Sequence, residues 1–294
     1  MPFTKNEHAA LWFTDQGSGP PLLLIPGGLF DPINGKRFWE IPGVVDHFVT
    51  QGYRVLVPDR RYSVGSTSAP FEIYSWEKEA ADFAAVVHAA KEEAVSLVAG
   101  SNGCSAAIRF ALAYPFLIRS FVLCWPVAPE NGWLLEAIEY SAALVEQVGP
   151  AVYVDRLREQ GVPRPGEKGA GFPFGFALLH DVNLVASFCS LDSHDAAQII
   201  RESGQALLSG DLLRGVSVND AAMLAAQSFP IGVIPAFPEN PVHTLEIAQK
   251  LTDHIPGAQM LPGFPEPPTP RFAAVRTEFC TVLQEALESK RSRE

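Results

Sequence analysis

The sequence predicts an α/β protein in which helices cover both faces of a mostly parallel sheet. Short continuous apolar runs, which are typical of strands buried on both faces, alternate with longer segments of helical spacing. This alternation of strands with helices favours parallel pairing. Hydrophobic residues make up 47% of the 294 residues, which is enough for a large core.

The first half of the chain contains most of the expected sheet. Short apolar runs predict strands at residues 22–25, 53–57, 94–98 and 121–125. Helical spacing predicts helices at 76–91 and 104–112, and Pro115 ends the second. Turn residues precede the first strand, and a loop of small residues follows the second.

Residues 129–227 interrupt this rhythm. Helices are expected there at residues 133–148, 178–188, 196–208 and 217–226, with a Gly- and Pro-rich loop at 160–175. Two further apolar runs, at 230–234 and 257–261, predict that the sheet resumes afterwards.

The pentapeptide Ala99-Gly100-Ser101-Asn102-Gly103 lies between an expected strand and an expected helix. Small residues flank the serine, as a sharp and strained strand-to-helix turn requires. Such a turn holds the serine oxygen at a helix N-terminus, where backbone N–H groups stabilise a developing anion. We therefore interpret Ser101 as a candidate nucleophile. The alternative is a plain Gly-rich turn with a capping serine.

Four segments in order resemble the α/β-hydrolase fold family. They are the stretch GSGPPLLLIPGG, the strand VLVPDRR, the pentapeptide around Ser101 and the strand that follows it. The resemblance covers residues 10–129 and resumes near 229. It implies a core built from residues 1–128 and 228–294, with residues 129–227 inserted as a helical lid over the active site.

The resemblance also implies positions for the remaining site residues. The oxyanion and binding residues would be Gly28, Asn102 and Leu29, although Pro26-Gly27 stands where the family usually has His-Gly. The acid should follow strand 230–234. Counting from the strand gives Glu239, and counting back from the next helix gives Asn240. We favour Glu239, because a carboxylate stabilises an imidazolium and an amide does not.

The histidine that the family places after the last core strand is missing. No histidine occurs from Ile255 to Glu294, and Glu266 is the only ionisable residue of the Pro-rich loop 262–270. We expect Glu266 to be exposed, like most glutamates. Among the seven histidines of the chain, His194 and His243 are the candidates for a displaced base, although each is more often structural.

Three functions remain open on these grounds. The first is an enzyme with lyase, cyclase or isomerase chemistry on a small, largely apolar carbonyl compound, with little activity on p-nitrophenyl esters. The second is a serine hydrolase of esters, lactones or C–C bonds with a displaced base. The third is a ligand-binding pseudoenzyme. For the pocket wall we expect Phe264, Trp125 and Phe188.

Bulk properties exclude several partners. The net charge of −11 disfavours nucleic acid and anionic membranes, and no apolar run is long enough for a membrane span. The four cysteines have no ligand spacing and are interpreted as free, buried thiols of a cytoplasmic protein without a signal peptide. No motif indicates a metal or another cofactor. The oligomeric state stays open.

Overall fold

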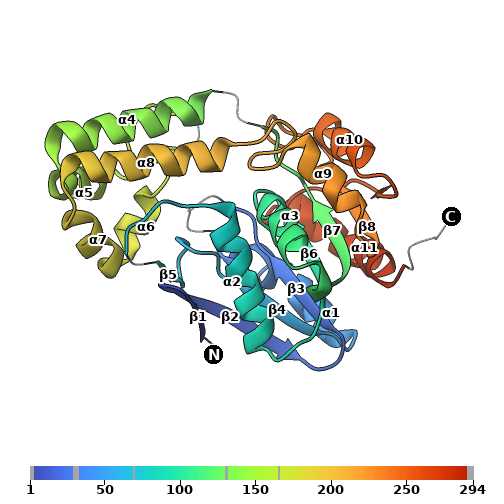
Figure 1. The fold of residues 1–294 in the computed structure, drawn as a ribbon. Coiled ribbons are helices and arrows are strands. Elements are labelled where there is room, and N and C mark those ends of the chain that lie inside the picture. Colours follow the sequence, from blue (N-terminus) through green and yellow to red (C-terminus); the bar gives the residue numbers. More distant parts are fainter. Residues whose placement is uncertain (1–2, 29–32, 69, 130–131, 165, 290–294) are drawn as a thin grey trace.

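The computed structural model describes residues 3–28, 33–68, 70–129, 132–164 and 166–289. Its centre is a twisted sheet (Figure 1). The strands of these residues are β1 (Phe3–Asn6), β2 (Ala9–Gly17), β3 (Pro21–Ile25), β4 (Arg54–Pro58), β5 (Thr67–Ser68), β6 (Val95–Gly100), β7 (Ile118–Cys124), β8 (Ile231–Ile234) and β9 (Gln259–Met260). The helices are α1 (Val44–Thr50), α2 (Trp76–Ala89), α3 (Gly103–Ala113), α4 (Trp133–Val148), α5 (Pro150–Gln160), α6 (Gly175–His180), α7 (Val182–Cys189), α8 (Ser193–Leu208), α9 (Val218–Ala225), α10 (Leu245–His254) and α11 (Pro270–Glu288).

The sheet confirms the predicted fold class. Its strand order is β1-β2-β4-β3-β6-β7-β8-β9, and β5 pairs with β2. All pairs from β4 to β9 are parallel, whereas β1 and β2 form an antiparallel edge. The sequence pattern did not predict this antiparallel edge or helices α1, α5 and α11.

Alternate residues of the central strands pack into two separate cores. Leu23 and Ile25 of β3 belong to the core beneath α2 and α3, and Leu22 and Leu24 belong to the core on the opposite face. Helices α1 and α11 cover that opposite face. Because both faces of the sheet are covered, its central strands are apolar without alternation.

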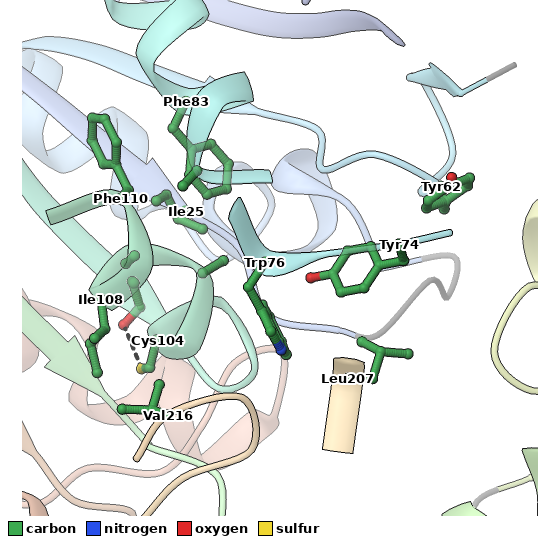
Figure 2. Packing of buried hydrophobic residues seen from close by; sticks show 14 of the residues in the cluster. Ile25, Tyr62, Tyr74, Trp76, Phe83, Cys104, Ile108, Phe110, Leu207 and Val216 are labelled. Atoms are coloured by element: carbon green, nitrogen blue, oxygen red, sulfur yellow. Dashed lines mark hydrogen bonds between the residues drawn. The ribbon is translucent and has the colours of Figure 1, made fainter. Parts of the chain in front are cut away.

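Helices α4 to α8, which follow β7 in the chain, lie together on one side of the structure, where α4 packs along α8 (Figure 1). Leu207 of α8 and Val216 join the same core as Trp76 of α2 (Figure 2). Helix α9 packs against α3 and α10. The helix expected at 178–188 is interrupted at Asp181, whose carboxylate caps α7. The division into a core and a lid stays a prediction.

Two findings concern the predictions about the cysteines and about membrane spans. All four cysteines are free, but Cys189 is exposed rather than buried. No helix within the described ranges is long and apolar enough to cross a membrane.

Candidate active site

Ser101 occupies the sharp turn between β6 and α3. Its φ is 53°, which is an uncommon conformation for a residue with a side chain. The Ser101 N–H donates to the Cys124 carbonyl at 2.9 Å, and the Ser101 carbonyl accepts from Cys104 N–H at 2.9 Å. These bonds hold the strained backbone in place. Cys104 is no alternative nucleophile, because complete burial raises the pKa of its thiol.

Close backbone contacts explain the small residues around this turn. A Cβ on Gly103 would lie 2.4 Å from the Pro26 carbonyl oxygen, and a Cβ on Gly27 would lie 2.9 Å from Ser101 Cβ. The loop Pro26–Gly28, here called the oxyanion loop, therefore lies directly against the serine. Side chains at these glycines would force the loop and the turn apart.

A histidine from the loop after β8 lies beside Ser101. His243 Nε2 lies 2.9 Å from Ser101 Oγ, and only 6% of the histidine is exposed. His243 directly precedes Thr244, whose hydroxyl caps the N-terminus of α10. Its backbone N–H donates to Asn240 Oδ1 at 3.0 Å. Two anchors, the capped helix and the Asn240 turn, thus fix the imidazole beside the serine.

A carboxylate from the loop after β9 reaches the other imidazole nitrogen. Glu266 Oε2 lies 3.3 Å from His243 Nδ1. The loops that follow β8 and β9 are joined by backbone bonds, from Phe264 N–H to the Pro235 carbonyl at 3.1 Å and from Phe237 N–H to the Phe264 carbonyl at 3.0 Å. Glu266 is therefore half-buried at the site and not exposed as its residue type suggested.

Asn240 also contacts His243 Nδ1, through its amide nitrogen at 3.1 Å. Its amide oxygen already accepts from the backbone N–H groups of Val242 and His243, so the nitrogen must face the ring. An amide N–H favours a bare Nδ1, whereas the Glu266 carboxylate favours Nδ1–H. Because hydrogen bonds to ionised groups are about twice as strong as neutral ones, the carboxylate selects Nδ1–H. Nε2 is then free to accept the serine proton.

The electrostatic surroundings keep the imidazole neutral. Burial and, secondly, the Arg214 guanidinium lower the pKa of His243 to about 4. Glu266 opposes this shift, because a nearby negative charge favours the imidazolium. Arg214 is itself buried and donates to the Asn102 amide oxygen at 3.1 Å.

The Gly28 and Asn102 N–H groups remain candidates for oxyanion donors. Asn102 follows the nucleophile at the start of α3, and Gly28 has a left-handed φ of 87°. Within the described residues, neither N–H has a hydrogen-bond acceptor in the protein. Leu29, also expected at this site, lies outside the described residues.

Other residues predicted for the site lie elsewhere. The Glu239 carboxylate is exposed and accepts from Leu245 N–H at 2.9 Å, so the preference for Glu239 as the acid is wrong. His194 is also wrong as a base, because its side chain is 76% exposed and lies 3.7 Å from Glu146.

The three expected wall residues are core residues. Trp125 stacks on Phe279 and donates to the Phe264 carbonyl, and Phe188 packs between Phe71 and Tyr153. The cavity of about 240 Å³ between the 62–66 loop and helices α6 and α7 is lined by neither Ser101 nor His243, so the expectation that these three residues form the wall of the substrate pocket stays a prediction. No group of three or more His, Cys, Asp or Glu within the described ranges could hold a metal ion.

The carboxylate and the histidine that meet near Ser101 thus lie on exchanged loops relative to the order that the resemblance implied. His243 follows β8, where the acid was expected, and Glu266 follows β9, where the histidine was expected. The sequence contains both halves of this exchange. What the sequence does not show is that His243 and Glu266 lie together, because each residue taken alone has an ordinary structural explanation.

Comparisons with known proteins agree with this architecture. A family model described as the alpha/beta hydrolase fold matches residues 20–165. An esterase from Thermogutta terrifontis is 20% identical, with a TM-score of 0.60 over 97% of this chain and 96% of the other. An esterase from Exiguobacterium antarcticum is 20% identical, with a TM-score of 0.61 over 98% and 99%.

An enol-lactonase from Burkholderia xenovorans is 17% identical, with a TM-score of 0.61 over 98% of this chain and 100% of the other. No curated protein sequence is detectably similar to the chain. With the parallel sheet, the turn at Ser101 and the family match combined, the chain has the α/β-hydrolase fold.

Proposed function

We propose that this chain is a serine hydrolase that cleaves a small, largely apolar carboxylic ester or lactone. The proposal rests on two successive contacts. Ser101 Oγ lies 2.9 Å from His243 Nε2, and His243 Nδ1 lies 3.3 Å from Glu266 Oε2. A nucleophile, a base and an orienting acid in this geometry activate a hydroxyl that is otherwise a weak nucleophile.

The reaction proceeds in two halves. His243 Nε2 takes the proton as Ser101 Oγ bonds to the substrate carbonyl carbon, and the backbone N–H groups of Gly28 and Asn102 stabilise the oxyanion. The imidazolium then gives the proton to the leaving oxygen, and an acyl-enzyme remains. Water attacks this ester with His243 as base, and the acid product leaves Ser101 as it began.

Glu266 acts through the histidine. Its carboxylate accepts from Nδ1–H, which keeps Nε2 in the accepting form and stabilises the imidazolium that both halves produce. The lyase, cyclase or isomerase interpretation assumed that no base reaches Ser101. The 2.9 Å contact removes that assumption, and no observation favours non-hydrolytic chemistry over hydrolysis.

Esterases and an enol-lactonase are among the proteins of similar fold, and they suggest the first substrates for a test. The enzyme is incubated with short-chain p-nitrophenyl esters, with lactones and with a fluorophosphonate probe, and the intact mass is measured. We expect turnover and one covalent adduct. Both should disappear in Ser101→Ala and His243→Ala.

Ser105→Ala is the matched control. Ser105 is also buried, lies one helical turn further on, and its hydroxyl has no hydrogen-bond partner within the described residues. This variant should keep full activity. A wild-type protein that is neither labelled nor active on any of these substrates would contradict the proposal and favour a ligand-binding protein.

A further inference from the structure

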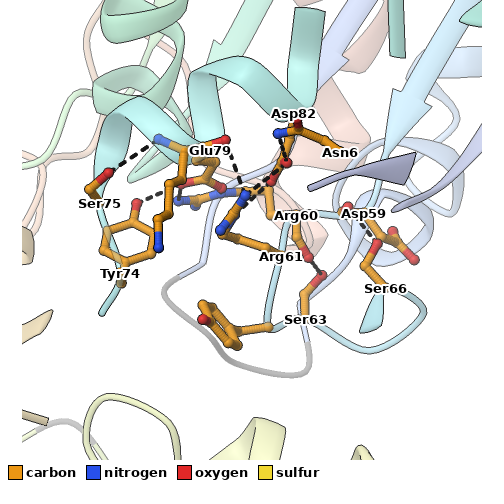
Figure 3. A network of polar contacts seen from close by, with 12 residues as sticks. Asn6, Asp59, Arg60, Arg61, Ser63, Ser66, Tyr74, Ser75, Glu79 and Asp82 are labelled. Carbon is orange, nitrogen blue, oxygen red and sulfur yellow. Dashed lines mark hydrogen bonds and ion pairs between the residues drawn. The ribbon is translucent and has the colours of Figure 1, made fainter. Parts of the chain in front are cut away.

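Arg60 forms a hydrogen bond with the oxyanion loop. It lies two residues after β4, is 5% exposed, and donates through Nη1 to the Gly28 carbonyl at 2.6 Å. Its other guanidinium edge pairs with the carboxylate of Glu79 on α2, through Nε and through Nη2 at 2.9 Å. Figure 3 shows Arg60 and Glu79 within this polar network. The Arg60 guanidinium therefore joins the oxyanion loop to the buried carboxylate of Glu79 on α2.

The rest of the network fixes Glu79 in turn. Glu79 is fully buried, and its carboxylate also accepts from Tyr74 Oη at 2.6 Å. The Tyr74 backbone N–H donates to Ser203 Oγ of α8 at 3.0 Å. Because a planar guanidinium presents its donors in a fixed fork, a fixed Glu79 determines where Nη1 points.

Gly28 needs such a fixed partner. It follows a second glycine and has a φ of 87°, so its backbone has more freedom than that of any other residue type. Rotation of this backbone would move the Gly28 N–H out of the position that its proposed oxyanion role requires. A bond that holds the Gly28 carbonyl limits that rotation and keeps the donor in position before substrate arrives, which is the condition for oxyanion stabilisation.

We propose that Arg60 is a positioning residue for the oxyanion loop, acting through its bond to the Gly28 carbonyl. This inference rests on the proposed function, because the oxyanion role of Gly28 belongs to it. The effect of the bond between Arg60 and the Gly28 carbonyl can be tested without measuring catalysis. The inference and the proposed function can therefore fail separately.

The neighbouring Arg61 provides a matched control. It is 2% exposed and pairs with the buried carboxylate of Asp82, also on α2, at 2.6 and 2.9 Å. Within the described residues its carbonyl acceptor is Lys78 rather than the oxyanion loop. Arg61 shares with Arg60 the loop, the burial and the kind of ion pair (Figure 3), but none of its hydrogen bonds within the described residues goes to Gly28.

The experiment compares Arg60→Lys with Arg61→Lys in the full chain. Gly27-Gly28 is the only Gly-Gly pair of the sequence, so a protein labelled with 1-¹³C,¹⁵N-glycine gives one carbonyl-coupled amide signal, that of Gly28. We expect this signal to shift or broaden in Arg60→Lys and to stay in place in Arg61→Lys. An unchanged signal in Arg60→Lys overturns the inference, whether or not the protein is a hydrolase.

Kinetics supply the second readout. Loss of one oxyanion donor costs about 10²–10³ in kcat, so a loosened donor should cost at least about tenfold with KM nearly unchanged. Arg61→Lys should stay within about twofold of wild type even where its Tm falls. Equal losses of kcat in both variants would assign Arg60 a structural role only and overturn the inference.

If Arg60→Lys does not fold, Tyr74→Phe replaces it, because it removes the hydroxyl that fixes Glu79. Tyr74→Phe should shift the Gly28 signal in the same direction as Arg60→Lys does, and it should lower kcat by a smaller factor. An unchanged signal in this variant overturns the inference as well. If the wild type itself is inactive, the proposed function fails, and the Gly28 signal alone tests whether Arg60 positions the oxyanion loop.

Discussion

Replacing Glu266 by glutamine tests the exchanged triad most directly. The substitution preserves the size of the side chain and removes the charge 3.3 Å from His243 Nδ1. We expect kcat to fall by about 10²–10⁴, because the amide no longer stabilises the imidazolium and no longer selects Nδ1–H. KM should change little, since Glu266 acts on the histidine and not on the substrate.

The geometry sets the lower limit of this range. Two unit charges about 4 Å apart interact by about 4 kcal/mol at an effective dielectric constant of about 20, and by about 1 kcal/mol in water. The Glu266 side chain is 25% exposed, which places the effect between these values, at about 3 kcal/mol. Each 1.4 kcal/mol is about tenfold in rate, so this term alone gives about a hundredfold. The wrong tautomer adds to it.

The assay is hydrolysis of the best ester or lactone substrate, with Glu239→Gln as the control. Glu239 belongs to the loop after β8, and its carboxylate only caps α10 through Leu245 N–H. A glutamine oxygen can accept the same bond, so kcat should stay at the wild-type value. If Glu266→Gln keeps more than about a fifth of the wild-type kcat, or if Glu239→Gln loses as much, the assignment of the acid is refuted.

Three further predictions concern the same site. Asn240→Asp in the Glu266→Gln background should recover at least about tenfold in kcat, because it places a carboxylate oxygen where the amide nitrogen lies 3.1 Å from Nδ1; no recovery would contradict the tautomer argument. The acid limb of kcat/KM should have its midpoint near pH 4, since His243 must be neutral to act as a base, and Arg214→Gln should raise that pKa and move the limb to higher pH. A limb that stays in place would show that Arg214 does not act on the base. Gly103→Ala should lower the free energy of unfolding by about 1–3 kcal/mol in a denaturant titration, because its Cβ would lie 2.4 Å from a carbonyl oxygen of the oxyanion loop; unchanged stability would mean that the loop can retreat.

The parts of the site that depend on local backbone were predictable from the sequence. The Ser101 turn needs small neighbours within two residues and a strand and a helix on either side, and all of these are visible in consecutive residues. The Pro26-Gly27-Gly28 loop follows directly from a buried strand. The parallel sheet follows likewise from uninterrupted apolar runs.

The acid and the base were not predictable in the same way. Their roles depend on which side chains of two loops meet, and residues 243 and 266 meet only because the chain passes through α10 and β9 and then pairs Phe264 with the loop after β8. Burial distinguishes the residue that reaches Ser101 from the residue that does not. His243 is covered and Glu239 is not, although both follow the same strand by a few residues.

The same limit affected the inserted helices. The break between α6 and α7 depends on one carboxylate, Asp181, which accepts from Asn183 and Leu184 N–H groups and starts a new helix. The apolar spacing across this point is continuous, so periodicity alone predicted one helix. Capping by a single side chain overrides a pattern that extends over eleven residues.

The exchange of loops has a chemical consequence for the carboxylate. Nothing in proton transfer requires the histidine to come from the last loop, provided that one nitrogen faces the serine and the other faces an acid. In this chain, however, His243 immediately precedes the capped N-terminus of α10, where the helix dipole is positive. Together with Arg214, this position disfavours the imidazolium that each half-reaction must form. The stabilisation of that cation therefore depends on Glu266 more heavily than it would at a neutral position, and the loss in Glu266→Gln should exceed the hundredfold given by the pair alone.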